Sequence, residues 1–177
     1  MGTKSKNETS KKPSKSLTME TGGGIQDPKK IIQEASKLIN SKDQKNIESA
    51  FKILSIECNR DASNSRAFYY RGQCYNLMGD FQRALYDFSV AIKISKEKKD
   101  SEETIALNYN YAGVQHYELG QLDEALKHYD LAVTYDASKG YFWYNRGLVK
   151  SRLDKVEDAV VDYKKAIELL SEADYLY

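Results

Sequence analysis

The chain has 177 residues, which is enough for one domain with a sizeable hydrophobic core. Its 27 basic and 26 acidic residues nearly balance, so no overall field points to nucleic acid as a partner. It contains no run of about 18 apolar residues, so no membrane-spanning helix is expected, and two cysteines are too few for a disulfide framework.

Residues 1–27 are predicted to be a disordered basic tail. They are mostly Lys, Ser, Thr, Gly and Asn, and a segment with so little apolar content cannot offset its ordering entropy by burial. Residues 1–30 hold seven lysines and three acidic residues, whereas the rest of the chain holds 20 basic and 23 acidic residues. A basic segment on a mildly acidic body suits an acidic surface of a partner, although many solubilising tails have the same composition.

From Pro28 onward the chain is predicted to be all-α. Apolar residues recur at steps of four and three, as in Ala84, Phe88 and Ala91, and no stretch alternates as a strand would. Asp27 followed by Pro28 is typical of an N-cap and a first helical residue. The expected helices cover residues 28–41, 46–58, 64–78, 81–96, 102–119, 122–136, 139–153 and 156–171. The expected turns include Gly79-Asp80, Gly120-Gln121 and Asp154-Lys155.

A repeat runs through this helical part. Three glycines each precede an alanine by twelve residues, and both series recur after 41 and then 34 residues. The pairs are Gly72 with Ala84, Gly113 with Ala125, and Gly147 with Ala159. A period of about 34 residues is the mark of stacked helix-turn-helix repeats, which favours a binding surface over an active site.

The residues around these pairs resemble the tetratricopeptide repeat (TPR) family, whose pattern reads aromatic-x-x-x-Gly-x-x-Tyr and then Ala-x-x-x-Phe-x-x-Ala. The first clear repeat matches throughout, with Phe68, Gly72, Tyr75, Ala84, Phe88 and Ala91. The two later repeats have His116 and Lys150 in place of the Tyr, and all three lack the closing Pro of the family. The resemblance predicts clear repeats at 65–98, 106–139 and 140–173, and a degenerate repeat at 31–64.

The resemblance implies an all-α, right-handed superhelical solenoid of antiparallel helix pairs, with about eight helices in residues 28–177. In such a solenoid the small Gly and Ala residues let the two helices of a repeat cross closely. The aromatic residues fill the space between one repeat and the next.

A variation within the repeats predicts two ion pairs. The first and third repeats have Arg directly before the Gly and Asp sixteen residues later, whereas the middle repeat has Ala112 and His128. Because the two charges are present together or absent together, we predict the pairs Arg71–Asp87 and Arg146–Asp162 between the helices of one repeat. Such pairs determine register more than they add stability.

If the chain is similar to this family, the first helix of each repeat lines a concave face. Tyrosine is more frequent at those positions than packing requires, and it offers stiff contact area with a hydroxyl, so we predict a protein-binding groove. Asn76, Asn110 and Asn145 are expected to hydrogen-bond the backbone of an extended peptide. The alternative is that the tyrosines pack against neighbouring repeats. The predicted groove residues are Tyr69, Tyr70, Gln73, Asn76, Asn110, Tyr111, Val114, Tyr117, Tyr141, Tyr144, Asn145, Leu148 and Arg152.

The best-known use of the family is a clamp of Lys, Asn and Arg on the two carboxylates of a chaperone C-terminus. The residues at the clamp positions here are Tyr69, Gln73, Tyr111, Tyr141 and Asn145. In a frame that starts at the degenerate repeat they are Ala35, Ile39, Tyr70, Leu107 and Tyr111. Neither set is cationic, which argues against capture of a chaperone tail.

No catalytic residue, cofactor or metal site is expected. His116 and His128 lie twelve residues apart, unlike a metal-binding pair, and each occupies a repeat position. No Gly-x-Ser-x-Gly, Walker or dinucleotide-binding motif occurs. Only Arg66 and Arg152 are basic among the expected concave positions, which argues against nucleic acid.

The sequence therefore predicts a non-enzymatic adaptor or scaffold in the cytoplasm that binds a peptide or helix of a partner protein. The specific version of this hypothesis is a subunit of a cytoskeletal or ciliary assembly, whose acidic surface would bind the basic tail. Two alternatives stay open, a co-chaperone-type recruiting module and a regulatory repeat domain of a larger enzyme complex. The apolar face after the third repeat is expected to remain partly uncovered.

Overall fold

The computed structural model describes the backbone of residues 27–174 and the side chains of residues 27–170. In this part of the chain all regular elements are α-helices. They are α1 (Pro28–Asn40), α2 (Gln44–Arg60), α3 (Ser65–Leu77), α4 (Phe81–Glu97), α5 (Glu102–Glu118), α6 (Leu122–Tyr135), α7 (Gly140–Arg152) and α8 (Val156–Asp174). The prediction of about eight helices is confirmed. The expected tail, apart from Asp27, lies outside the described residues.

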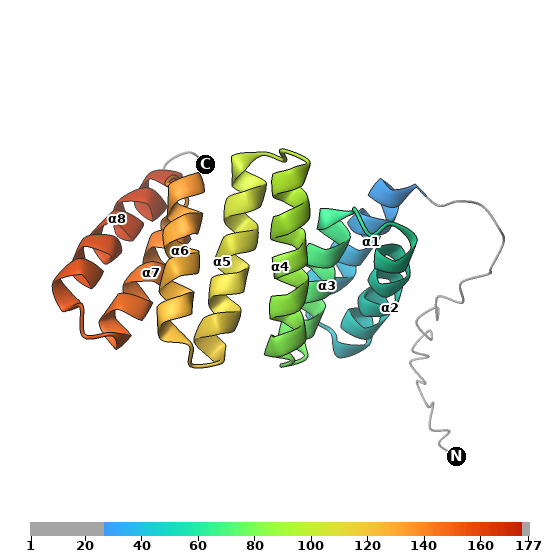
Figure 1. Ribbon diagram of the computed structural model, residues 1–177, viewed down its shortest axis with the longest axis horizontal. Coiled ribbons are helices and arrows are strands. Elements are labelled where there is room, and N and C mark those ends of the chain that lie inside the picture. Colours follow the sequence, from blue (N-terminus) through green and yellow to red (C-terminus); the bar gives the residue numbers. More distant parts are fainter. Residues whose placement is uncertain (1–26, 175–177) are drawn as a thin grey trace, which may run out of the picture.

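The helices stack in pairs along the long axis of the molecule, with α1 and α2 at one end and α8 at the other (Figure 1). Each helix packs against the next one in the sequence, and in addition α1 packs against α3 and α5 against α7. The odd-numbered helices therefore form one layer, called the A layer below, and the even-numbered helices form a second layer.

The helix boundaries follow local signals. The Asp27 carboxylate accepts a hydrogen bond of 3.0 Å from the backbone N–H of Lys29, as expected for an N-cap. The next four helices are capped in the same way, by Asp43, Asn64, Asp80 and Ser101. Gly79, Gly120 and Asp154 have φ values of 77°, 73° and 58°, which confirms the three turns expected there.

The repeated glycines are required because each lies against an aromatic ring sixteen residues later. The nearest ring atom would be 3.0 Å from a Cβ at Gly72 (Phe88), 2.8 Å at Gly113 (Tyr129) and 2.9 Å at Gly147 (Tyr163). Carbon atoms that are not bonded to each other do not pack this closely. Each of the three clear repeats therefore closes by packing an aromatic ring of its second helix against a glycine of its first.

The outer face of α8 is apolar and exposed. Ile167 is 67% exposed, whereas the residues at the same repeat position, Ile92 and Val133, are 9% and 7% exposed. Ile92 and Val133 are covered by the repeat that follows them, and Ile167 has no such cover in the described part of the chain. Among the helices that the structure describes, none combines the length and the apolarity that crossing a bilayer requires.

Candidate functional site

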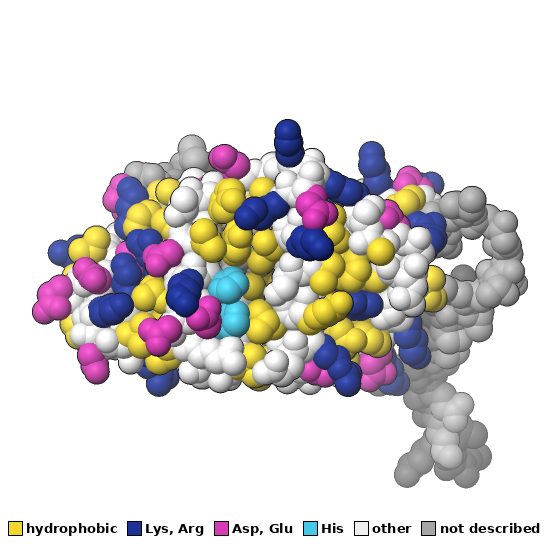
Figure 2. Space-filling model, viewed as in Figure 1, with side chains coloured by type: hydrophobic (Ala, Val, Ile, Leu, Met, Phe, Trp, Pro, Cys, Tyr) yellow, Lys and Arg dark blue, Asp and Glu magenta, His cyan; other side chains and the backbone are white. Residues whose placement is uncertain are grey.

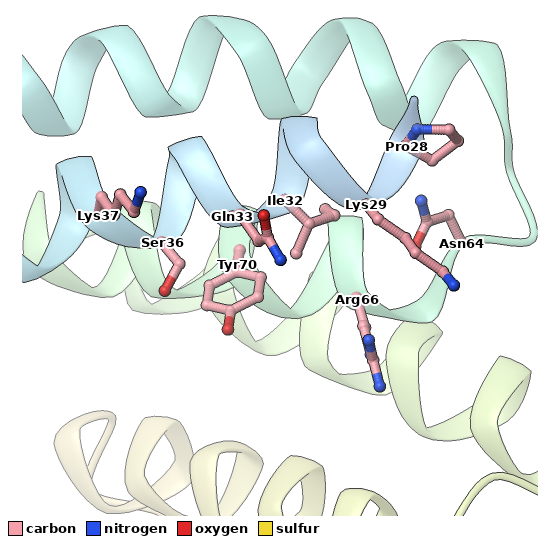
Figure 3. A pocket seen from close by; sticks show the side chains of 9 residues that line it. All are labelled: Pro28, Lys29, Ile32, Gln33, Ser36, Lys37, Asn64, Arg66 and Tyr70. Carbon is pink, nitrogen blue, oxygen red and sulfur yellow. The ribbon is translucent and has the colours of Figure 1, made fainter. Parts of the chain in front are cut away.

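A hollow of about 770 Å³ lies between α1 and α3 (Figure 3). It is lined by Pro28, Lys29, Ile32, Gln33, Ser36, Lys37, Asn64, Arg66 and Tyr70. Lys29 and Lys37 lie toward opposite ends of this set, with Gln33 and Ser36 between them near the Tyr70 ring (Figure 3). The hollow thus presents a row of polar side chains beside one aromatic ring.

The amphipathic character of α1 positions these side chains. Ile31, Ala35 and Ile39 are buried in contact with the rest of the fold. Lys29, Gln33, Ser36 and Lys37 follow one another at steps of four, three and one, which places them on a single other face of the helix.

A second hollow of about 210 Å³ lies between α3 and α5. It is lined by Ser65, Arg66, Tyr69, Tyr70, Thr104, Leu107 and Asn108. Because Arg66 and Tyr70 line both hollows, the two adjoin across α3. We call the two together the α1–α3–α5 groove.

The charge of this groove is one-sided. Lys29, Lys37 and Arg66 line it, and no carboxylate does. Within the described part of the chain, none of these three side chains forms an ion pair. The neighbouring hollow of about 390 Å³, which Arg66 also lines, has both signs, from Asp61, Lys98 and Asp100. The excess of positive charge is therefore confined to the two hollows of the groove.

The tyrosines at the middle of the A layer are half-buried and in contact with one another. The Tyr69 ring lies 4.9 Å from the Tyr70 ring and 5.4 Å from the Tyr111 ring, both edge to face. Tyr111 also stacks on buried Phe88, with ring centroids 5.3 Å apart. Burial raises the pKa of Tyr69, and its hydroxyl accepts a 2.6 Å hydrogen bond from Gln73. Tyr69 and Tyr70 thus line the groove, and Tyr69 and Tyr111 pack against each other between neighbouring repeats.

The tyrosines of α7 are more open. Tyr141 and Tyr144 are 40% and 50% exposed. Burial, and then the proximity of Tyr111, raises the pKa of Tyr141 to about 12. Tyr117 is half-buried, and the guanidinium of exposed Arg152 lies 6.0 Å from the centre of its ring.

The predicted asparagines are less available than expected. Asn110 is 3% exposed, and its side-chain oxygen accepts a 2.9 Å hydrogen bond from Asn145 of the next repeat. This pair joins α5 to α7 and occupies polar groups that were expected to face a peptide. Val114 and Leu148 are half-buried, as is Asn76.

The residues that α1 contributes were missing from the predicted groove. In the frame predicted for the degenerate repeat, 31–64, Ala35 and Ile39 stand at clamp positions, but this assignment was wrong because both side chains are buried, at 0% and 6% exposure. The spacing of Lys29, Gln33, Ser36 and Lys37 opposite the apolar residues of α1 was the available signal. Lys29 and Lys37 therefore join Arg66 as cations of the groove, in addition to the basic residues expected at concave positions.

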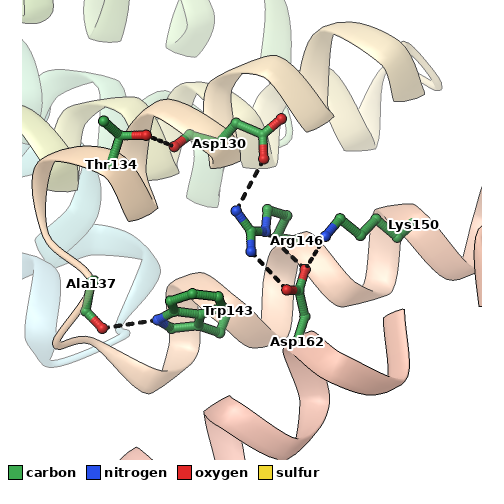
Figure 4. A network of polar contacts seen from close by, with 7 residues as sticks. All are labelled: Asp130, Thr134, Ala137, Trp143, Arg146, Lys150 and Asp162. Carbon is green, nitrogen blue, oxygen red and sulfur yellow. Dashed lines mark hydrogen bonds and ion pairs between the residues drawn. The ribbon is translucent and has the colours of Figure 1, made fainter. Parts of the chain in front are cut away.

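The two predicted ion pairs are confirmed. Arg71 binds Asp87 through two hydrogen bonds of 2.7 Å, and Arg146 binds Asp162 through bonds of 2.7 and 2.8 Å (Figure 4). Lys150, which stands at the family's Tyr position, adds a contact of 2.9 Å to Asp162.

The third repeat extends this pair into a network. Arg146 also reaches Asp130 of the preceding repeat at 3.1 Å and lies over the Trp143 ring, 4.6 Å from its centre (Figure 4). Burial opposes ionisation of Asp162, yet the hydrogen bonds from Arg146 and Lys150 hold the pKa of its carboxyl below the usual value.

In the middle repeat, Ala112 and His128 stand where the other two repeats have the ion pair, and the ring of His128 contacts that of His116. The sequence spacing did not indicate a pair, but the antiparallel packing of α5 and α6 brings the rings of His116 and His128 to 4.6 Å (Figure 2). The Nδ1 atom of His116 lies 2.6 Å from the side-chain oxygen of Gln121, and that of His128 lies 2.9 Å from the backbone oxygen of Glu124. No group of three or more metal-ligating side chains occurs among the described residues.

Through His128, the stability of the protein is expected to depend on pH. Burial, and then the proximity of His116, lowers the pKa of His128 below the ordinary value of about 6.5. A His whose pKa is lowered by folding contributes fully above about pH 6.5, and stability falls as the pH drops from there toward the folded-state pKa. We expect His128→Gln to reduce the loss of melting temperature between about pH 7.5 and about pH 5.5. Equal losses in His128→Gln and the unmodified protein would contradict this.

Comparison with known families gives two matches to the tetratricopeptide repeat. One family model of that description matches residues 66–94 and another matches residues 141–169. The chain is also similar to tetratricopeptide repeat protein 16 of Mus musculus, with 23% identity over 150 residues. The match covers 82% of this chain and 19% of that protein, so this chain spans less than a fifth of the relative.

Solved structures share the same fold. MamA aligns with a TM-score of 0.64 and 18% identity over 82% of this chain and 90% of that chain. BtubC (BKLC) from P. vanneervenii aligns with a TM-score of 0.69 and 17% identity over 84% of this chain and 66% of that one. The second TPR of Spaghetti (RPAP3), bound to the HSP90 peptide SRMEEVD, aligns with a TM-score of 0.55 and 21% identity over 65% and 94%. The predicted helical repeat fold is confirmed.

Proposed function

We propose that this chain, a member of the tetratricopeptide-repeat family, is a non-catalytic adaptor that binds a peptide segment of a partner protein on its A layer. The observation that carries the proposal is the α1–α3–α5 groove, where polar side chains and half-buried tyrosines surround open space. Tyrosines and adaptable polar groups are typical of surfaces that bind peptides. The peptide bound to the second TPR of Spaghetti (RPAP3) supports this use of the fold.

Photo-crosslinking at single positions tests where a partner binds. A photoreactive benzoylphenylalanine would replace Tyr70, which lines both hollows, or Tyr144 of α7. The matched control is Tyr86 of α4, which is 66% exposed and lines neither hollow. We expect the first two positions to crosslink the same partner segment, identified by peptide mass spectrometry, and Tyr86 to crosslink none of it. Crosslinks to that segment from Tyr86 alone, or from no position, would contradict the proposal.

A more specific version is that the protein is a subunit of a cytoskeletal or ciliary assembly in the cytoplasm. The lysines of residues 1–27 would then contact an acidic surface of that assembly while the groove holds a peptide. Comparing the crosslinked partners of the full chain with those of a chain lacking residues 1–26 tests this. Loss of assembly proteins on deletion is the expected result, and an unchanged set would contradict it.

A co-chaperone-type recruiting module is the second candidate, and the HSP90 peptide in a structure of the same fold is the observation that favours it. The clamp positions of this chain hold Tyr69, Gln73, Tyr111, Tyr141 and Asn145, which supply no cation for the two terminal carboxylates. Binding of the peptide SRMEEVD that disappears when its C-terminus is amidated would favour this candidate. A regulatory repeat domain of a larger enzyme complex is a further alternative, and crosslinks from Tyr70 to a catalytic subunit would indicate it.

A further inference from the structure

We infer that the segment bound in the α1–α3–α5 groove is acidic and that its carboxylates contact Lys29, Lys37 and Arg66. The inference rests on the proposed peptide-binding function and adds the chemistry of the ligand. These three cations line the two hollows, and no Asp or Glu lines either one. They do not occupy the clamp positions of the family, so the recognition they provide differs from the carboxylate clamp.

These cations differ from most of the charges that help hold the fold together. Arg71 and Arg146 form ion pairs with buried carboxylates, and Lys139 forms an ion pair of 2.7 Å with Glu103 of α5. Lys29, Lys37 and Arg66 have no such partner among the described residues, and their positive charges share one hollow. Like charges gathered at a concave surface raise the local concentration of ligands of the opposite sign. An acidic segment is the occupant that complements this charge.

The geometry of α1 gives the spacing of the acidic residues. Lys29 and Lys37 are eight residues apart on one helix, which corresponds to about 12 Å along its axis. An extended peptide rises about 3.3 Å per residue, so acidic side chains about three to four residues apart match this distance. Gln33, Ser36 and Tyr70 lie between the two lysines and offer hydrogen bonds to the intervening backbone. Arg66 lies where the two hollows adjoin and is placed to meet a further carboxylate.

Two other occupants fit less well. Residues 1–26 of this chain hold five lysines and two glutamates, so their net charge has the same sign as the groove. Single-stranded nucleic acid needs open aromatic faces for stacking as well as cations. The rings of Tyr69 and Tyr70 instead contact each other edge to face, and Tyr69 also packs against Phe88 and Tyr111.

The experiment is a selection from a displayed library of random peptides of about twelve residues, long enough to span the groove. The full 177-residue chain is compared with Lys37→Glu/Arg66→Glu and with the matched control Lys52→Glu, an exposed lysine of α2 that lines no part of the groove. We expect the unmodified protein and the control to select peptides with Asp or Glu about three to four residues apart. The double variant should lose this preference.

Affinity measurements by fluorescence anisotropy complete the test. The best selected peptide should bind about tenfold more weakly to the double variant, and about tenfold more weakly when its acidic residues are replaced by amides. Circular dichroism melts check that the variants are folded. Because both substituted side chains are exposed, little loss of melting temperature is expected.

The possible failures are distinguishable. Selected peptides without acidic enrichment that still lose affinity with Tyr70→Ala would overturn the inference and leave the peptide-binding function standing. Failure to select any peptide would count against both. An oligouridylate RNA that competes more strongly than the best peptide, and loses affinity with Lys37→Glu/Arg66→Glu, would replace the acidic peptide with nucleic acid.

Discussion

Phe88→Ala is expected to lower the free energy of unfolding by about 3–5 kcal/mol. Phe88 is fully buried, its ring lies against Gly72 where no Cβ fits, and the Tyr111 ring stacks on it. Truncation leaves a cavity between the two helices of the first clear repeat and removes support from a tyrosine of the A layer. Denaturation in urea, followed by circular dichroism, measures the loss.

Tyr86→Ala is the matched control for this prediction. Tyr86 lies two residues away on the same helix and is 66% exposed, so its loss should change stability by no more than about 0.5 kcal/mol. A similar loss in both variants would mean that the Phe88 ring does not hold the repeat closed. A second consequence is expected at the groove, because the Tyr69 ring lies 6.0 Å from Phe88 and should become more mobile in the variant.

The features that the sequence predicted well are those that recur in each repeat. A residue that packs in the same place three times leaves a periodic signal, as the glycines and the aromatic rings opposite them do. The Arg71–Asp87 and Arg146–Asp162 pairs were predictable for a related reason, since both partners are absent together from the middle repeat. Differences between the repeats of one chain thus predicted which charged side chains contact each other.

The groove was harder to predict because it depends on features that do not recur. The polar face of α1 belongs to a degenerate repeat, and the family pattern aligned there pointed to the buried Ala35 and Ile39. It therefore missed Lys29 and Lys37, which line the groove. The contact of His116 with His128 and the bond between Asn110 and Asn145 depend on how helices face each other across a pair or between repeats. A repeat period reveals buried residues and polar pairs that recur, but it gives no information on a polar contact that occurs only once.

The ion pairs of the first and third clear repeats are expected to respond differently when their arginine is removed. Arg71→Met is expected to destabilise the protein by about 3–5 kcal/mol, because it leaves a buried carboxylate without its cation. The Asp87 side chain is 1% exposed, and Arg71 is its one ion-pair partner among the described residues. Arg146→Met should cost clearly less, because Lys150 remains 2.9 Å from Asp162 and keeps that carboxylate paired.

Urea denaturation of the two single variants, and of Arg71→Met/Asp87→Leu, tests this reasoning. Removing both charges of the first pair leaves no buried ion, so the double variant should recover most of the stability that Arg71→Met loses. The middle repeat supports this expectation, since it folds with Ala112 and His128 at the same positions. If Arg71→Met and Arg146→Met lost equal stability, Lys150 would not be acting as a second cation for Asp162. A double variant no more stable than Arg71→Met would show that the loss comes from packing of the Arg71 side chain, which also lies 5.3 Å from the centre of the Phe68 ring, rather than from the unpaired charge.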